Sequence, residues 1–416
     1  AWALGLIMGP DGGGALVRVV NCKRSLRPGS AGQKPGGRPE GLPHYTVPMA
    51  ASPAKDLNPG TQRLVALDAF RGAVMVFMIM VNNNGSERDA YAQLRHSAWH
   101  GWTLTDTVFP SFVWIVGVAI TLSLGKRLAV GVPRSRLLLT ALRRAAILFV
   151  LGMAVYAFPH FDFSTQRILG VLQRIAICYL AASAIYLWCG VRGQIAWLVG
   201  LLAAYWLIMT FAPVPGFGSG RLDVEGNFAH YVDRLVLGTH NYGQTHDWDP
   251  EGIVSTLPAI ATALFGLLAG RVLQMRRSLT ERTTWMFMTG ALLVAAGWAL
   301  SFWMPINKKL WTDSFCLFMA GLDFTACAIS VWVIDGLGWK RPFQPAVILG
   351  MNAIAIYLAS EFGAELIESI QHRIYRTVFA PLASPANASL LYSLAFTGVM
   401  YLIAYAMYRK RWFIRI

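Results

Sequence analysis

The chain has 416 residues, of which 55% are hydrophobic and only 14% are charged. A soluble domain normally carries about 25% charged residues, and the mean hydropathy of +0.47 points the same way. This composition excludes a disordered, collagen-like or coiled-coil protein as an overall class. The net charge of +15 does not predict a nucleic-acid partner, because the basic residues lie between apolar runs, where they direct membrane topology. The five cysteines contain no CxxC pair, so we expect neither a disulfide framework nor a metal site.

Residues 1–62 differ in composition from the rest of the chain. The stretch from Arg27 to Pro59 is rich in Pro, Gly, Ser and Ala and has no sustained apolar period, which predicts a disordered N-terminal extension. The sequence opens with Ala1, whereas Met49 is a plausible natural initiator methionine. We therefore interpret residues 1–48 as an upstream extension of the reading frame or a remnant of cloning.

Residues 63–416 contain ten mostly apolar runs. A membrane-spanning helix needs about 20 such residues, so the sequence predicts an all-α polytopic membrane protein with about ten transmembrane helices. The expected spans are approximately Leu67–Val81, Thr105–Leu124, Leu138–Phe158, Ile168–Trp188, Ile195–Ala212, Ile253–Leu273, Thr284–Met304, Ser314–Ile334, Ala346–Phe362 and Leu390–Tyr408.

The connecting segments carry an uneven distribution of basic residues. The segments on one side of the expected membrane contain 16 Lys and Arg, and the longer segments on the other side contain 9. Cytoplasmic segments are usually the richer ones, so we expect both termini in the cytoplasm. The acidic loop 213–250 is then external and forms a partly folded cap.

Two polar groups lie in the first span. Asp68 and Arg71 are three residues apart and share one helix face, so they can pair. This is either a helix-end ion pair, with Arg71 reaching the lipid headgroups, or part of a functional site. At the other end of the span, Asn82 begins the run NNNG. Asn and Gly commonly end helices, but Asn82 could also hold a carbonyl or an oxyanion.

The segment HSAWHGWTLTD joins the first two spans. Thr103 and Asp106 have the spacing of a capping box at the start of a helix, and Trp99 fits an interfacial aromatic belt. His96 precedes Asp106, an acid that can reach back and fix the tautomer of the imidazole. That arrangement suits a general base better than a metal site, because the spacing matches no strong ligand pattern.

Two arginines flank the start of the fourth span, in the run RILGVLQRIA. A buried arginine at Arg174 needs an intramembrane carboxylate or an anionic ligand as its partner. Asp323, which lies within a later span, could serve as that partner. Arg167 lies on the external side of the same helix.

These segments resemble the heparan-α-glucosaminide N-acetyltransferase family in a bacterial-type version. The resemblance runs from about Arg63 to Ile416 and depends on several motifs in order: RLVALDAFRG, VNNNG, HSAWHGWTLTDTVFPSF, RILGVLQRIA, VPGFG, WDPEGI, INKKLW and GMNAIAIYL. Each motif alone is weak, and their order and separations make the match specific. It implies a transmembrane acyltransferase domain over residues 63–416, in a bacterial inner membrane.

The resemblance implies that an acetyl group passes from cytosolic acetyl-CoA to an amino sugar on the external face. His96 matches the family's catalytic histidine, acting as general base or as acetyl-accepting nucleophile, with Asn82 as its companion and Asp106 as the acid of the next helix. His100 stands where the lysosomal enzyme has Asn, a departure that concerns the acceptor more than the chemistry. The sequence alone does not choose between direct transfer and an acetyl-histidine intermediate.

Basic residues at the cytosolic end of the second and third spans suit the phosphates of CoA. The expected cofactor-binding residues are Arg71, Arg143, Arg144 and Arg174, and the expected substrate-binding residues are Arg167, Trp99 and Glu251. The expected partners are acetyl-CoA, the amino sugar and the bilayer, and a homodimer is left open. Two alternatives remain: an acyltransferase that acts on a hydroxyl or moves a longer chain, and a small-anion transporter.

Overall fold

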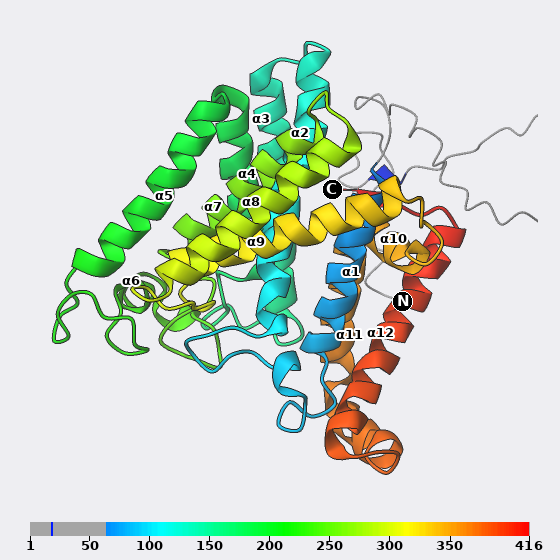
Figure 1. Ribbon diagram of the computed structural model, residues 1–416. Helices are drawn as coiled ribbons and strands as arrows, with labels where there is room; N and C mark the ends of the chain where they lie inside the picture. The colour runs from blue at the N-terminus through cyan, green and yellow to red at the C-terminus, as the bar shows by residue number, and fades with distance from the viewer. Residues whose placement is uncertain (1–17, 20–63, 416) are drawn as a thin grey trace, which may run out of the picture.

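A computed structural model describes residues 18–19 and 64–415 (Figure 1). The expected disordered extension and the suggested start at Met49 lie outside the described residues, apart from the strand β1 (Arg18–Val19), which pairs with β2 (Ile414–Arg415). The helices are α1 Val65–Asn82, α2 Leu104–Ala129, α3 Arg134–Ala157, α4 Val171–Trp188, α5 Val191–Phe211, α6 Phe228–Leu237, α7 Thr256–Leu273, α8 Leu279–Leu300, α9 Asp313–Ser330, α10 Gln344–Met351, α11 Ala353–Ile374 and α12 Pro385–Arg409.

The expected all-α polytopic architecture is confirmed. Within the described residues, nine helices are long and apolar enough to cross a membrane, and the bent pair α10–α11 brings the number to ten if it forms one span. The helix α6 and a short 3-10 turn, Gly238–His240, lie within the loop 213–250. The four described cysteines are free thiols.

The ninth expected span is wrong in one respect, because it is not a single straight helix. The chain turns by 82° between α10 and α11, and Asn352 lies at the break. The Asn352 amide donates to the backbone oxygen of Trp412 at 3.0 Å and accepts from the backbone nitrogen of Ile414 at 3.1 Å. The side chain thus bonds the C-terminal segment. The local sequence does not predict this contact, because the partners of Asn352 are about 60 residues away.

The helices divide into a central group and a lipid-facing group. The membrane segment of α7 is 72% buried, whereas those of α3 and α8 are 22% buried. The centre forms around α2 and α7, where small residues let the backbones approach. A Cβ on Gly117 would lie 1.9 Å from the backbone oxygen of Ala263, and one on Gly266 would lie 1.9 Å from that of Trp114. Such close small-residue contacts are typical of packed membrane helices.

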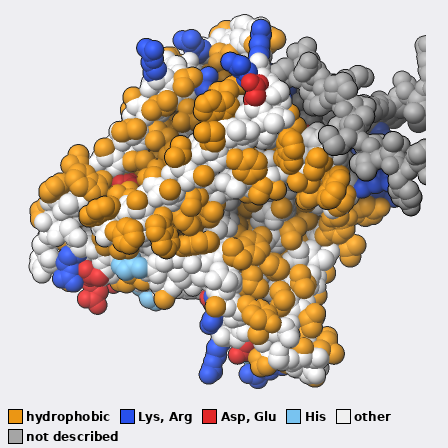
Figure 2. All heavy atoms as spheres, viewed as in Figure 1, with side chains coloured by type: hydrophobic (Ala, Val, Ile, Leu, Met, Phe, Trp, Pro, Cys, Tyr) orange, Lys and Arg blue, Asp and Glu red, His pale blue; other side chains and the backbone are white. Residues whose placement is uncertain are grey.

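The two ends of the bundle differ in their side chains. The upper end in Figure 1 carries the α2–α3 connection and the C-terminus, and the lower end carries α6 and the segment between α1 and α2. Hydrophobic side chains cover the middle of the surface (Figure 2). Lys and Arg dominate the visible upper end, whereas acidic and basic groups mix at the lower end. This pattern agrees with the expected cytoplasmic termini, whose orientation across the membrane stays a prediction.

Candidate active site

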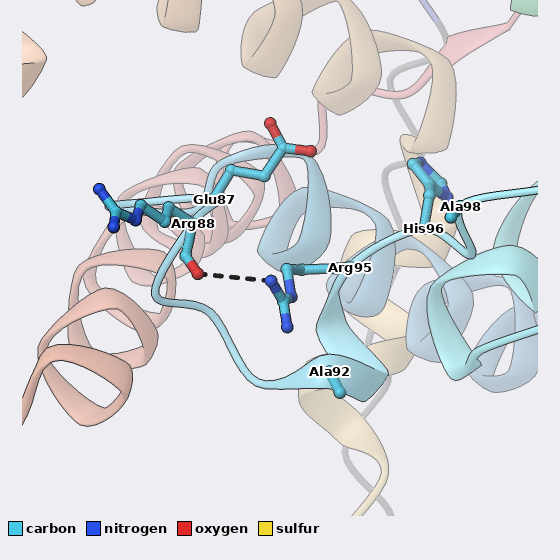
Figure 3. A pocket seen from close by; sticks show the side chains of 6 residues that line it. All are labelled: Glu87, Arg88, Ala92, Arg95, His96 and Ala98. Atoms are coloured by element: carbon cyan, nitrogen blue, oxygen red, sulfur yellow. Dashed lines mark hydrogen bonds between the residues drawn. The ribbon is translucent and has the colours of Figure 1, made fainter.

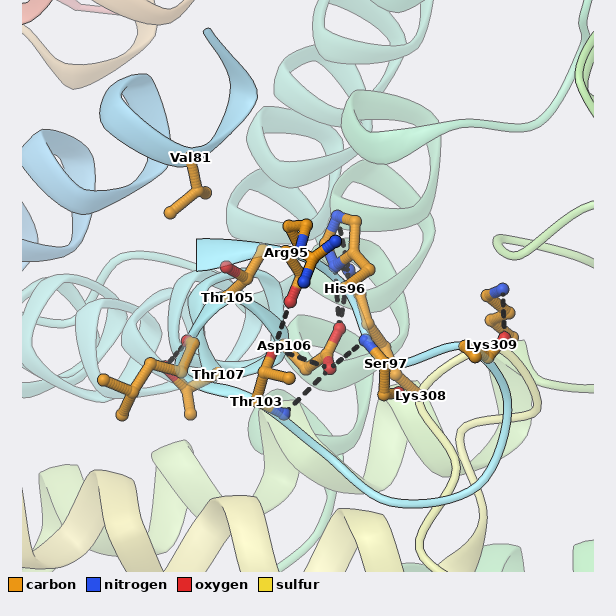
Figure 4. A network of polar contacts seen from close by, with 12 residues as sticks. Val81, Arg95, His96, Ser97, Thr103, Thr105, Asp106, Thr107, Lys308 and Lys309 are labelled. Atoms are coloured by element: carbon orange, nitrogen blue, oxygen red, sulfur yellow. Dashed lines mark hydrogen bonds and ion pairs between the residues drawn. The ribbon is translucent and has the colours of Figure 1, made fainter. Parts of the chain in front are cut away.

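His96 and Asp106 form a close pair at the lower end of the bundle (Figure 4). His96 follows the 3-10 turn Ala92–Leu94, and its Nδ1 lies 2.7 Å from Oδ1 of Asp106. The other Asp106 oxygen accepts hydrogen bonds from the backbone nitrogens of Ser97 at 3.1 Å and Thr103 at 3.0 Å. Asp106 is therefore both the N3 residue of the capping box of α2, whose N-cap is Thr103, and the partner of the imidazole. With Nδ1–H donating to the carboxylate, Nε2 keeps its lone pair for a base or a nucleophile.

The two members of the pair differ in solvent exposure: the imidazole is accessible to a substrate, and the carboxylate that orients it is buried. The His96 side chain is 46% exposed, whereas that of Asp106 is 1% exposed. His96 lines an open hollow of about 590 Å³ (Figure 3), together with Glu87, Arg88, Ala92, Arg95 and Ala98. Arg95 donates to the backbone oxygen of Arg88 at 3.4 Å on the wall of this hollow. A polar molecule can therefore approach the imidazole from the lower end.

Asn82 is the last residue of α1. Its side chain interacts with the carboxyl group of Glu361 on α11, and within the described residues no hydrogen bond joins it to His96. The neighbouring amides are used differently, because Asn83 donates to the backbone oxygen of Ile79 at 2.8 Å and Asn84 donates to that of Val81 at 3.0 Å. Of the three asparagines, Asn82 alone is exposed, and its role in the site stays a prediction.

Lys308 joins this site and was not identified from the sequence. Its Nζ lies 3.1 Å from Nδ1 and 3.5 Å from Nε2 of His96, and 3.6 Å from Oδ1 of Asp106. Burial lowers the pKa of Lys308, and the nearby Asp106 carboxylate opposes that effect. The signal in the sequence is the pair of lysines in INKKLW, one of the motifs of the family resemblance, but nothing in the motif itself places Lys308 beside His96.

A separate cavity of about 610 Å³ runs between helices α1, α2, α3, α4 and α11. Its lining on α2 extends from Phe112 to Ser123, a rise of about 17 Å along the helix. The walls are mostly apolar, and Arg71 and Arg144 line it as its two basic residues. The cavity therefore combines a long apolar passage with positive charge.

The structure separates the four expected cofactor-binding arginines. Arg71 pairs with Asp68 at 3.5 Å, which confirms the expected contact on one helix face. Arg144 donates to the hydroxyl of Tyr179 at 3.4 Å and stacks over its ring. Arg143 is exposed, and neither it nor Arg174 lines the cavity. The geometry therefore groups Arg71 with Arg144.

Arg174 is almost fully buried at the start of α4. Its guanidinium donates to the backbone oxygen of Gly252 at 2.9 Å and to the hydroxyl of Ser255. The suggested pairing of Arg174 with Asp323 is wrong, because Asp323 accepts from the hydroxyl of Ser111 at 2.5 Å instead. Arg174 Nη2 has a backbone carbonyl and a hydroxyl on the loop before α7 as its partners, whereas Nε and Nη1 have no hydrogen-bond partner within the described residues. The sequence gives no indication of these contacts, because the loop lies about 80 residues away.

Arg167 and Glu251, two of the expected substrate-binding residues, contact each other. Arg167 donates to both oxygens of Asp249, at 2.6 and 2.7 Å, and to Glu251. Burial disfavours the charge on Arg167, but the surrounding acidic groups outweigh this and raise its pKa well above the ordinary value. Buried ion pairs thus join Arg167 of the RILG motif to Asp249 and Glu251 of the WDPEGI motif.

Trp99, the third expected substrate-binding residue, anchors the segment that carries His96. Its indole nitrogen donates to the backbone oxygen of Leu222 at 2.9 Å. Its ring packs edge-on against Trp248 and His230, and those two rings stack with centroids 4.1 Å apart. The loop 213–250 therefore supports the histidine segment from one side. Within the described residues, no three His, Cys, Asp or Glu side chains are grouped as metal ligands.

The fold and the site define a polytopic membrane protein with a histidine–carboxylate pair at one end and a mostly apolar cavity between the helices, lined by Arg71 and Arg144. The family model "Heparan-alpha-glucosaminide N-acetyltransferase, catalytic" matches residues 63–307, and the chain belongs to this family. It is 29% identical over 439 residues to the heparan-alpha-glucosaminide N-acetyltransferase of Mus musculus and 28% identical over 446 residues to that of Homo sapiens. Each match covers 90% of this chain and 64% of the relative, so the chain spans just under two thirds of their length.

Proposed function

We propose that this protein is a transmembrane N-acetyltransferase that moves an acetyl group from acetyl-CoA on one face of the membrane to the amine of an amino sugar on the other. The observation that carries the proposal is the His96–Asp106 pair, 2.7 Å apart and facing an open hollow. The relatives' names support the choice of an N-acetyl product, because both are named as heparan-alpha-glucosaminide N-acetyltransferases.

The cavity between the helices suits the donor. Arg71 and Arg144 offer charge-assisted hydrogen bonds to the phosphates of CoA, and the apolar walls suit the pantetheine arm. The lining reaches Met78 on α1 and Phe112 on α2. Asn82 lies four residues beyond Met78, so about 6 Å of α1 separates the cavity lining from Asn82. Asp106 lies six residues before Phe112, so about 9 Å of α2 separates the lining from the carboxylate that bonds His96. A thioester that passes the end of the cavity therefore approaches the histidine from within the bundle.

The chemistry follows from the arrangement around His96. Asp106 holds the imidazole in the tautomer that leaves Nε2 free, so His96 either removes the proton from the attacking amine or takes the acetyl group itself. Asn82 is the proposed companion that steadies the thioester carbonyl. The ion pairs of Arg167 with Glu251, and the contacts of Trp99, hold the loops that border the acceptor side.

The acceptor is an amino sugar in this proposal. A primary amine on a sugar ring is nucleophilic only after it loses a proton, which is the step that a histidine base supplies. His100 stands beside the site, and its Nδ1 lies 3.4 Å from the amide nitrogen of Asn307. We propose a bacterial inner-membrane location and an envelope sugar amine as the natural acceptor.

Purified protein incubated with acetyl-labelled acetyl-CoA and a panel of amino sugars tests the proposal. We expect label in an amide of the sugar, identified by mass spectrometry and stable to mild base. Label in an ester would favour an acyltransferase that acts on hydroxyls. Uptake of a small anion into vesicles, without any acetyl transfer, would favour the transporter and contradict the proposal.

A further inference from the structure

Lys308 lies in the loop between α8 and α9, 212 residues after His96 in the sequence. Its side chain is 16% exposed, and its Nζ lies within 3.6 Å of both members of the His96–Asp106 pair. Figure 4 shows Lys308 and His96 reaching the Asp106 carboxylate from different segments of the chain. A lysine so close to a base and a carboxylate is placed to act on charge that develops during a reaction.

The N–H groups of Lys308 are only partly used in this arrangement. In the tautomer whose Nδ1–H donates to Asp106, Nδ1 has no lone pair to accept from Lys308, and the 3.1 Å approach of Nζ to Nδ1 is then not a hydrogen bond. The remaining contacts of Nζ are with Nε2 of His96 at 3.5 Å and with Asp106 at 3.6 Å, and both are longer than an ordinary hydrogen bond. Lys308 is therefore held mainly by charge, and it can turn an N–H group toward a new acceptor.

The loop that carries Lys308 is held in place by other contacts. The backbone nitrogen of Gly101 donates to the backbone oxygen of Ile306 at 2.7 Å. Lys309, the next residue, donates to the backbone oxygen of Ala98 at 2.8 Å. These bonds join the two segments without Lys308, so a structural anchoring role does not explain its position beside the imidazole.

We propose that Lys308 is a catalytic residue that donates a hydrogen bond to the oxyanion formed during acetyl transfer; this inference rests on the proposed function. The amine nitrogen attacks the thioester carbon, a C–N bond forms, and the π electrons of the carbonyl move to oxygen. The Lys308 ammonium stabilises that negative charge. The oxyanion then collapses, the C–S bond breaks, and the thiolate of CoA leaves with the bonding electrons and takes up the proton that His96 removed from the amine.

The same oxyanion forms if Nε2 of His96 is the attacking atom, so the role of Lys308 does not depend on which route the enzyme uses. Asn82 lies at the end of α1 and interacts with Glu361, whereas Lys308 lies at the imidazole itself. A reacting carbon in contact with Nε2 of His96 would therefore have its oxygen within reach of Lys308 Nζ.

The test compares four proteins: wild type, Lys308→Met, Lys308→Arg and Lys309→Met. The methionine keeps the length of the side chain but removes the charge and the donors. Removal of one oxyanion donor lowers kcat by about 10²- to 10³-fold, and we expect this for Lys308→Met with little change in either KM. We expect Lys308→Arg to recover most of the loss and Lys309→Met to lose much less kcat than Lys308→Met, because Lys309 bonds the backbone of Ala98 and does not reach His96.

A Lys308→Met protein with wild-type kcat would overturn this inference and leave the proposed function standing. An equal loss in Lys309→Met, or a rise in KM without a fall in kcat, would also overturn it, because both indicate a structural role for the loop. If Lys308→Met fails to fold, Lys308→Cys treated with 2-bromoethylamine replaces it; complete modification without recovery of kcat contradicts the role. Absence of transfer by the wild type itself would overturn the proposed function and this inference together.

Discussion

Replacement of Arg144 with Gln tests where the donor binds. Two arginines line the cavity, but they differ in their surroundings. Arg71 lies 3.5 Å from the Asp68 carboxylate, which offsets part of its charge. Arg144 contacts the hydroxyl of Tyr179, and it makes no ion pair with a carboxylate in the described part of the chain. Of the two arginines in the cavity wall, Arg144 is therefore the one whose positive charge is less offset, and it attracts a phosphate group more strongly.

The expected magnitude follows from the kind of bond that is lost. A hydrogen bond to a charged group contributes about 1.5–3 kcal/mol, and each 1.4 kcal/mol is tenfold in an equilibrium constant. Arg144→Gln should thus raise the KM for acetyl-CoA by about 10- to 100-fold, with the KM for the amino sugar nearly unchanged because the acceptor enters at the other end. Arg143→Gln should have a smaller effect, since Arg143 is exposed outside the cavity lining.

The assay is initial-rate kinetics on purified variants, with direct CoA binding measured by calorimetry. Arg192→Gln is the control for the general loss of one positive charge, because Arg192 is exposed and lies in the first turn of α5, outside the cavity lining. An acetyl-CoA KM that stays at the wild-type value in a folded Arg144→Gln protein would refute the reasoning. Equal shifts of both KM values would refute it too, since the loss would then be structural.

Three further predictions follow from the site and the topology. His96→Ala should lower transfer by about 10²- to 10⁴-fold or more while calorimetry still detects CoA binding, and His100→Ala should be milder; near wild-type turnover of His96→Ala would contradict its role. His230 is held neutral, because burial lowers its pKa to about 3. Below about pH 6.5 His230 takes up a proton in the unfolded chain but not in the folded protein, so the free energy of unfolding falls with pH, by about 2 kcal/mol at pH 5. The melting temperature should therefore depend less steeply on pH in His230→Phe than in wild type, and an unchanged dependence would contradict this prediction. A cysteine introduced in the loop 213–250 should react with an impermeant reagent from outside the cell, and labelling only from the cytoplasm would overturn the orientation.

Much of the fold was predictable because it depends on local composition. Membrane spans are recognised by length and apolar content, and nine of the ten expected spans correspond to single helices. The pair Asp68–Arg71 was predictable because residues three apart share a helix face. The contacts of Asp106 with Thr103 and His96 were predictable because both residues are close to it along the chain.

The contacts that sequence reasoning missed join segments far apart. Lys308 reaches His96 across 212 residues, and Arg167 reaches Asp249 across 82. Local spacing carries no information about such pairs, and Lys308 looked like one of many topology charges. The break at Asn352 was missed because its partners lie in the C-terminal segment, about 60 residues away.

Transfer across a sealed membrane tests the central claim most directly. Proteoliposomes that hold an amino sugar inside receive acetyl-labelled acetyl-CoA outside, and the contents are analysed after the external donor is removed. In vesicles whose protein presents the α2–α3 connection to the outside, the account predicts N-acetylated sugar in the lumen with unlabelled CoA left outside, and no product with His96→Ala. Product that forms only when donor and acceptor share one compartment would contradict it.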